Sequence, residues 1–482
     1  MKCIILPAFL LLTSYNILAQ QKVGIGTNTP TEKLEVAGNI KADTVKPNAF
    51  KLTTNAGQGK VLTSDVAGNA SWNTSNAGAS ASNIGYGVWG DCATNGNISE
   101  YQPLTDTAVN TGEVFGWAVA VSGDFAIVGI PQKTIAGNLY QGSANMYQFN
   151  GTYWEFMQTI SDGTNANGYF GQAVSISGNY AIVGVPQATV GTNAAQGAAC
   201  IYQYNGSKWV FMQRINNTAG ATGDKFGASV SISGNLAIVG ALSDKINANL
   251  GQGAATIYKY NGTSWLQQQY LYETTGANAD DNFGSSVSIS GNYAVVGIPQ
   301  ANPTGYLDWG AANIYQYNGS NWVLLQKIFS PVGGETGDYF GNAVSISDNY
   351  LIIGSKYDQI NAKIQGSASI YQFKGGSWVW METITSAVAV GVSNLFGASV
   401  SISDNYAIVG ANNYFSNKIG AAYIYLRVGQ SWQKLQTITD PGGDIDGFGS
   451  SAGMDAATKR FLIGAPAFGV ANIGKVVFGK IN

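Results

Sequence analysis

The sequence predicts an all-β protein built from repeats, and two observations carry that prediction. A Phe-Gly pair followed by a short apolar segment recurs seven times at nearly constant spacing, beginning at Phe115, Phe170, Phe226, Phe283, Phe340, Phe396 and Phe448. Gly accounts for 63 of 482 residues, aromatic residues for 12% and charged residues for only 11%, a composition typical of turn-rich β proteins. A fixed period of this length indicates a repeat architecture.

Each repeat has the pattern of four short strands, which residues 173–215 illustrate. Val174 and Ile176 alternate with small and polar residues in the first strand, and residues 180–183 form the continuous apolar run of a strand covered on both faces. Gly178-Asn179 and Asn205-Gly206 supply two-residue turns between antiparallel strands. The third and fourth strands are expected at residues 198–204 and 209–215.

Seven repeats of four antiparallel strands predict a seven-bladed β-propeller over residues 96–482. The last repeat lacks a fourth strand after residues 475–478, whereas residues 98–104 precede the first repeat and have the pattern of that strand. We therefore expect residues 98–104 to complete the last blade and close the ring. Large aromatic residues recur in the fourth strands and are expected to pack between blades: Trp154, Trp209, Trp265, Trp322, Trp378 and Trp432.

The first 95 residues differ in composition from the repeats. Residues 1–19 have the pattern of a secretory signal peptide, with Lys2, an apolar run too short to span a bilayer, and Ala19 at a cleavage site. Residues 20–72 predict a short β-rich stalk, and residues 73–95 a linker rich in Ser, Ala, Asn and Gly.

The stalk resembles shaft segments of bacterial tail-fibre-like surface proteins, through residues 24–27, 33–38 and 59–65. So few apolar residues cannot form a stable core alone. The resemblance implies that chains associate side by side, for which a homotrimer is one form. A flexible secreted leader is the alternative.

The composition also excludes several kinds of chemistry. Histidine is absent, which removes Ser-His-Asp and Cys-His catalysis and His-ligated metal sites. The net charge is −3 without a basic run, so we expect no nucleic-acid partner. Cys200 occupies a position where other repeats carry Asn, Thr, Ser or Tyr, and we expect a free thiol rather than a bridge to Cys92.

The repeats resemble the FG-GAP repeat, the unit of integrin α-subunit propellers. The seventh copy carries both halves of the motif, Phe448-Gly449 and Gly464-Ala465-Pro466. The resemblance implies a propeller that binds ligands or mediates adhesion through its loop face. Many members carry an Asp-rich calcium loop between the first two strands, but here two-residue turns such as Gly234-Asn235 replace it. We therefore expect no metal and no cofactor.

The variable loops indicate where a ligand would bind. In a four-stranded meander, the second-to-third and fourth-to-first loops emerge at one end of the blade, and loops carry function on rigid scaffolds. Second-to-third loops of blades four to six hold aromatic residues that suit protein or glycan ligands, with two acidic residues nearby: Tyr306, Trp309, Tyr357, Tyr414 and Phe415, and Asp281 and Asp338. The alternative is that these rings pack on neighbouring loops.

An acidic residue stands two positions before the phenylalanine in five repeats: Glu113, Asp224, Asp281, Asp338 and Asp446. These carboxylates could form a ring that holds a cation or polar ligand, but we favour capping of the N–H groups of their own turns. No acidic pair stands out from the repeated background, so we expect no catalytic residues and no enzyme.

The favoured function is a secreted or cell-surface binding or adhesion module, with a protein or glycan ligand on a cell or matrix surface. The alternatives are a structural head of a surface fibre without a dedicated ligand and, less favoured, a carbohydrate-active enzyme.

Overall fold

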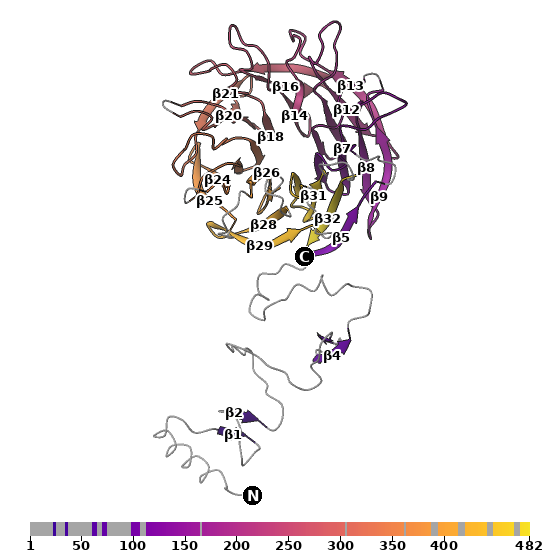
Figure 1. Cartoon of the computed structure of the whole chain (residues 1–482), viewed down its shortest axis with the longest axis vertical. Coiled ribbons are helices and arrows are strands. Elements are labelled where there is room, and N and C mark those ends of the chain that lie inside the picture. Colours follow the sequence, from indigo (N-terminus) through magenta and orange to yellow (C-terminus); the bar gives the residue numbers. More distant parts are fainter. Residues whose placement is uncertain are drawn as a thin grey trace, which may run out of the picture. The chain divides into compact units, whose positions relative to one another are not determined.

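Seven four-stranded antiparallel sheets form a ring, which confirms the predicted seven-bladed β-propeller (Figure 1). The structure, a computed structural model, describes residues 98–106, 112–163, 166–303, 306–360, 363–386, 394–412, 420–440, 447–466 and 473–482, and the backbone of four short strands nearer the N-terminus. The chain divides into two compact units, Met1–Cys92 and Ala93–Asn482, and the propeller lies in the second.

In the first unit, β1 (Val23–Ile25) pairs in parallel with β2 (Leu34–Val36), and β3 (Lys60–Ser64) pairs antiparallel with β4 (Ala70–Thr74). Strand β4 extends two residues into the predicted linker, through Thr74. The predicted signal peptide, the linker after residue 74, the rest of the stalk and Cys92 lie outside the described residues. The proposed division of residues 1–95 therefore stays a prediction.

The blades follow one another along the chain, four strands each. Blade one consists of β6 (Val119–Ser122), β7 (Phe125–Ile130), β8 (Ser143–Phe149) and β9 (Trp154–Ile160). Blade two consists of β10 (Val174–Ser177), β11 (Tyr180–Val185), β12 (Ala198–Tyr204) and β13 (Trp209–Ile215). Blade three consists of β14 (Phe226–Ser233), β15 (Leu236–Ala241), β16 (Ala254–Tyr260) and β17 (Trp265–Leu271). Blade four consists of β18 (Ser286–Ser290), β19 (Tyr293–Ile298), β20 (Ala311–Tyr317) and β21 (Trp322–Ile328).

The last three blades repeat this arrangement. Blade five consists of β22 (Ala343–Ser347), β23 (Tyr350–Ser355), β24 (Ser367–Lys374) and β25 (Ser377–Ile384). Blade six consists of β26 (Phe396–Ser403), β27 (Tyr406–Ala411), β28 (Ala421–Val428) and β29 (Ser431–Thr439). Blade seven consists of β30 (Ser451–Asp455), β31 (Arg460–Ala465), β32 (Lys475–Ile481) and, from the other end of the repeats, β5 (Ile98–Leu104).

The pairing of β5 with β32 confirms the predicted ring closure. The two strands run antiparallel, with Leu104 opposite Val476 and Ile98 opposite Ile481. In Figure 1 the violet strand β5 lies beside the yellow strand β32. A strand from the N-terminal side therefore completes the C-terminal blade and pairs with the edge of β32 that would otherwise be open.

The hydrophobic core lies between the blades. First strands of neighbouring blades adjoin each other around the axis, and each core cluster combines residues of two adjacent blades. The second strand is buried on both faces, as Ala181, Ile182 and Val183 illustrate at 0% exposure. Cys200, in the third strand, is a free and buried cysteine, as expected.

The glycine of each Phe-Gly pair is required by close backbone contact between blades. Gly227 has a φ of +92°, which L side chains rarely adopt. A Cβ on Gly227 would lie only 2.2 Å from the carbonyl oxygen of Ala198 in the preceding blade, and a Cβ on Gly184 of that blade only 2.0 Å from the carbonyl oxygen of Gly227. Phe226, beside it, is fully buried. The Phe-Gly motif therefore marks the positions where the backbones of two neighbouring blades are in close contact.

The recurrent tryptophans pack between blades, as predicted, and a glutamine of the preceding blade also binds the backbone of five of them, whereas Glu382 binds the N–H of Trp432. Trp209 is 2% exposed, and its ring meets that of Phe125 in blade one at 5.4 Å. Gln158 of β9 accepts a hydrogen bond from Trp209 N–H at 2.9 Å and donates one to the Trp209 carbonyl at 2.9 Å. The same paired bonds join Gln102 to Trp154, Gln213 to Trp265, Gln269 to Trp322 and Gln326 to Trp378.

The alternating serines of the first strands satisfy the N–H groups at the inner edge of the next blade. Ser175 Oγ accepts a hydrogen bond from Ile232 N–H, and Ser177 Oγ from Gly234 N–H, each at 3.1 Å. An unpaired backbone donor buried away from water is costly. The first strand of a blade has no neighbouring strand on its inner side, and the serine hydroxyls of the preceding blade accept the hydrogen bonds that such a strand would have accepted.

Arg460 marks the junction where the ring closes. Arg460 is the first residue of β31, the second strand of blade seven. In blade two the first residue of the second strand, β11, is Tyr180, and its ring contacts Trp265 of the next blade. The Arg460 guanidinium lies 3.8 Å from the ring centroid of Phe149 in blade one. It also donates to Glu100 of β5 at 2.9 Å and to Asp124 at 2.6 Å. One side chain thus joins both ends of the propeller chain.

Candidate binding face

The two kinds of variable loop emerge on one face and are hydrogen-bonded to each other. Phe340 N–H, at the end of a fourth-to-first loop, donates to the carbonyl of Trp309 in the second-to-third loop of the preceding blade at 2.9 Å. Tyr339 N–H donates in the same way to Asp308 at 3.1 Å. The same pairs form at the first, second and third blades. Paired loops give this face a defined backbone on which side chains can be held.

The acidic residues before the Phe-Gly pairs hold these loops in shape. Asp281 accepts a hydrogen bond from Asn278 N–H and Asp338 accepts one from Glu335 N–H, each at 2.6 Å, and Asp224 likewise accepts from Ala221. This confirms the capping interpretation for these three residues.

Glu113 accepts instead from Thr134 N–H of its own second-to-third loop at 3.0 Å. Asp446 lies outside the described residues. The acidic positions that the structure describes therefore act on the loop backbone.

Burial raises the pKa of these capping carboxyls. The pKa of Asp224 rises to about 6 and that of Asp338 also to about 6, while that of Asp281 shifts in the same direction for the same reason. Asp281 and Asp338 are each only 1% exposed. A ligand on the surface would therefore meet the loops that these residues position, and their direct contact with a ligand stays a prediction.

Tyr306 and Trp309, predicted as ligand contacts, lie together in one loop of blade four. Their rings meet edge to face at 5.2 Å, and Tyr306 is 45% exposed. Trp309 is half-buried and packs against Phe329, with ring centroids 5.9 Å apart. Its indole also covers Gly334, where an added Cβ would lie 1.4 Å from the ring. Trp309 thus anchors the loop, and Tyr306 presents the open surface.

Tyr357, the third predicted contact, lies on the neighbouring part of the same face. Its ring meets that of Tyr339 at 5.3 Å, and the Lys356 ammonium lies 5.2 Å from its centroid. The Tyr339 hydroxyl reaches Asp308 of the Tyr306 loop at 3.5 Å. Tyr306, Trp309 and Tyr357 are therefore linked through Tyr339 and Asp308. Tyr414 and Phe415 lie outside the described residues.

Phe329, Tyr339 and Lys356 belong to this cluster but were missed by sequence reasoning. Phe329 directly follows β21, and Tyr339 precedes a Phe-Gly pair, so both lie in a fourth-to-first loop. A search for aromatic residues in those loops as well as in the second-to-third loops would have found them.

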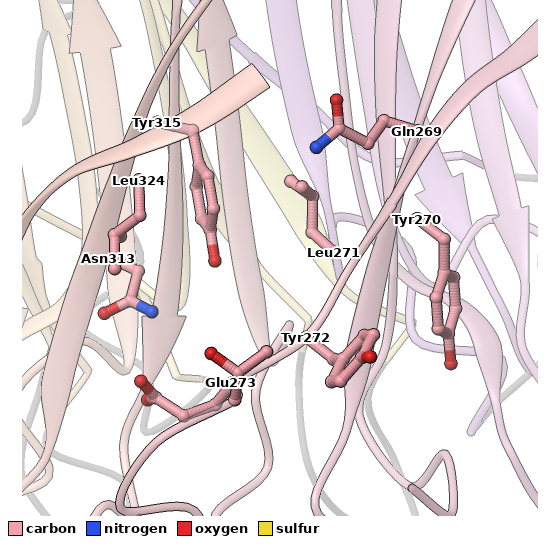
Figure 2. A pocket seen from close by; sticks show the side chains of 9 residues that line it. Gln269, Tyr270, Leu271, Tyr272, Glu273, Asn313, Tyr315 and Leu324 are labelled. Carbon is pink, nitrogen blue, oxygen red and sulfur yellow. The ribbon is translucent and has the colours of Figure 1, made fainter. Parts of the chain in front are cut away.

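A cavity of about 230 Å³ lies between blades three and four, near the loop face (Figure 2). One wall consists of residues 269–274, the end of β17 and the chain that follows it. The other wall consists of Asn313 and Tyr315 of β20 and Leu324 of β21. Figure 2 shows Glu273, Asn313 and the Tyr315 hydroxyl at the polar part of the cavity. Sequence reasoning did not identify this cavity, because its two walls come from different repeats.

No candidate metal cluster appears in the part of the chain that the structure describes: no group of three or more Cys, Asp or Glu residues there could hold an ion. In the same part of the chain, no helix is long and apolar enough to cross a membrane.

The sequence profile of the FG-GAP repeat matches five segments that together cover more than half of the chain, residues 98–147, 154–202, 209–258, 265–315 and 322–371. Each segment begins with the fourth strand of one blade and ends in the third strand of the next. The matched unit therefore spans a junction between blades. No curated protein matches the sequence.

Proposed function

Because the chain belongs to the FG-GAP repeat family, we propose that it is a secreted or cell-surface adhesion module that binds a protein or glycan through its loop face. The observation that carries the proposal is the linked aromatic cluster of Tyr306, Trp309, Tyr339 and Tyr357 on paired loops. Half-exposed aromatic side chains offer rigid contact area with a polar tip and are enriched where proteins recognise ligands.

The scaffold supports this role because it fixes the loops before a ligand arrives. Seven interlocked blades and buried capping carboxylates leave little loop entropy to lose on binding, which favours affinity. The signal-like residues 1–19 support export to the cell exterior. We propose no catalytic role, no cofactor and no nucleic-acid partner.

The test begins with a binding screen of the full chain against immobilised glycans, matrix proteins and whole cells. Tyr306→Ala should weaken binding to the surface that the screen identifies by about tenfold or more, because it removes an exposed aromatic contact. The matched control is Tyr153→Ala, since Tyr153 is 50% exposed in the turn between the third and fourth strands, at the opposite end of blade one. Equal loss of binding in both variants, or loss only with Tyr153→Ala, contradicts the assignment of the face.

We further propose that residues 20–72 assemble chains side by side, as in a homotrimer. The motive is the shaft-like sequence, which contains too few apolar residues for a core of its own. Light scattering should then give a multiple of the chain mass for the protein starting at Gln20 and a single chain mass for a protein starting at Ser82. A single chain mass for both would contradict the proposal.

A further inference from the structure

We propose that the loop face binds a protein segment in which an acidic residue is flanked by apolar residues, and that Lys356 binds its carboxylate. This assignment rests on the proposed function, because Lys356 belongs to the same aromatic cluster. The Lys356 ammonium lies 5.2 Å from the ring centroid of Tyr357 and 6.0 Å from that of Tyr339. All three side chains are half-buried, so a ligand that packs on these rings also lies beside the ammonium.

Lys356 has no acidic partner among the described residues, in contrast to four other partly buried cations at the loop end of the blades. Those four lie 2.8–3.9 Å from a carboxylate oxygen: Lys133, Arg214, Lys327 and Lys475. Burial lowers the pKa of the Lys356 side chain, because the charged form loses solvation and no carboxylate compensates. The tyrosine rings attract the ammonium, but more weakly than a carboxylate would. The ammonium is therefore available to an anionic group of a ligand.

A neighbouring side chain fixes the backbone of Lys356. Proline, which has no N–H, directly follows the second strand in four other blades, at Pro131, Pro186, Pro299 and Pro466. The Lys356 N–H donates to Asn342 Oδ1 at 2.9 Å, and Asn342 Nδ2 donates to the carbonyl of Gly397 in blade six at 3.0 Å. Asn342 thus pairs the N–H that the lysine introduces and joins this loop to the next blade. A ligand therefore meets a lysine whose backbone is already ordered, which favours affinity.

The loops around the cluster expose apolar side chains that suit a protein better than a glycan. Leu307 is 66% exposed, Val332 51% and Phe329 36%. Leu307 directly follows Tyr306, and its carbonyl accepts a hydrogen bond at 2.9 Å from Gly337 N–H in the loop that holds Phe329 and Val332. Aliphatic side chains offer nothing to the hydroxyl groups of a sugar, whereas covering them with apolar residues of a protein is favourable. The apolar surface therefore favours a protein ligand.

Two acidic side chains in the adjoining loops determine where the ligand carboxylate lies. Asp308 of blade four is half-buried, and Glu335, in the loop between blades four and five, is exposed. The hydroxyl of Tyr339 reaches Asp308 at 3.5 Å, whereas Lys356 of blade five lies over the ring of Tyr339. Like charges across an interface are unfavourable. The ligand carboxylate is therefore directed towards blade five and Lys356, away from Asp308 and Glu335.

The test uses an array of short random-sequence peptides, with an array of neutral and acidic glycans in parallel, both probed with the full chain. The peptides that bind should be enriched in Asp or Glu next to Leu, Ile, Val or Phe. The affinity of the tightest peptide is then measured by fluorescence polarisation. Lys356→Met keeps most of the apolar stem and should weaken this affinity by about tenfold or more, whereas Lys356→Arg should keep it within about threefold.

The matched control is Lys225→Met, which should leave the affinity unchanged. Lys225 is half-buried on the same face and directly precedes the Phe-Gly pair of blade three, as Tyr339 does in blade five. The proposal is overturned if no peptide binds, if the bound peptides lack acidic residues, if Lys356→Met binds as tightly as the wild type, or if Lys225→Met weakens binding equally. Tyr306→Ala separates these failures from failure of the proposed function: a glycan or cell surface that this variant no longer binds would leave the loop face as the binding face with another ligand class.

Discussion

Replacing Arg460 by Ala should loosen the propeller at the junction where the ring closes. The side chain is 8% exposed and joins Glu100 of β5, Asp124 of blade one and the ring of Phe149. These contacts connect residues more than 300 positions apart in the sequence, so no local structure can replace them.

The magnitude follows from how deeply each partner is buried. Removing one member of a buried ion pair costs roughly 3–5 kcal/mol. Asp124 is 61% exposed and adds little, and Glu100 keeps Lys480 at 3.3 Å after the substitution. We therefore expect Arg460→Ala to lower the free energy of unfolding by an amount at the lower end of this range, about 3 kcal/mol. For a ring of this size that corresponds to a fall of about 4 °C in melting temperature.

The assay is thermal unfolding followed by circular dichroism, with Lys208→Ala as the control. Lys208 is an exposed cation in the third-to-fourth turn of blade two, and its removal should change stability by less than about 0.5 kcal/mol. The loss in Arg460→Ala should persist in 1 M salt, because buried pairs are screened far less than exposed ones. A variant that melts within about 1 °C of the wild type would falsify this account of the closure.

Three other predictions concern the propeller. Gln213→Ala breaks two hydrogen bonds, of 2.8 and 2.9 Å, to the backbone of the next blade. It should lower the free energy of unfolding, measured in urea, by about 2 kcal/mol. The control is Gln267→Ala, since Gln267 is exposed and its removal should change that free energy by less than about 0.5 kcal/mol. Burial raises the pKa of Cys200 to about 12, so iodoacetamide at pH 8 should modify it only after unfolding in guanidinium, as mass spectrometry of its peptide would show. The pKa values of Asp224 and Asp338, about 6, lie above the unfolded value of about 3.9, so the folded protein binds more protons between these pH values. The stabilisation from these two groups is therefore lost as pH rises through 6. The melting temperature should be higher at pH 5 than at pH 7.5, and a lower melting temperature at pH 5 would contradict this prediction.

The fold was predictable from the sequence because its signals are local. The repeated Phe-Gly pairs, the apolar run at residues 180–183 and the turns at Gly178-Asn179 and Asn205-Gly206 each report on a few neighbouring residues. Counting strands per repeat was enough to assign residues 98–104 to the last blade, because a closed ring requires the same number of strands in every blade.

The candidate site was predictable only in part. The sequence by itself indicated which loops share a face and that Tyr306, Trp309 and Tyr357 lie in them, since strand direction alternates regularly in a meander. It did not distinguish Tyr306, which is 45% exposed, from Trp309, which is half-buried on Gly334. Exposure depends on what the neighbouring loop places against each ring.

The tertiary structure alone decided what happens at the junctions between blades. Asn145 and Asn313 hold the same position in the repeat, yet the amide of Asn145 is hydrogen-bonded at both ends and the amide oxygen of Asn313 is buried without a partner among the described residues. Gln158 finds its partner at Trp209, more than 50 positions later. A repeat determines its own strands and turns, because those need only adjacent residues. The surroundings of a side chain at a junction depend on two repeats that differ in sequence, and only the folded ring brings them together.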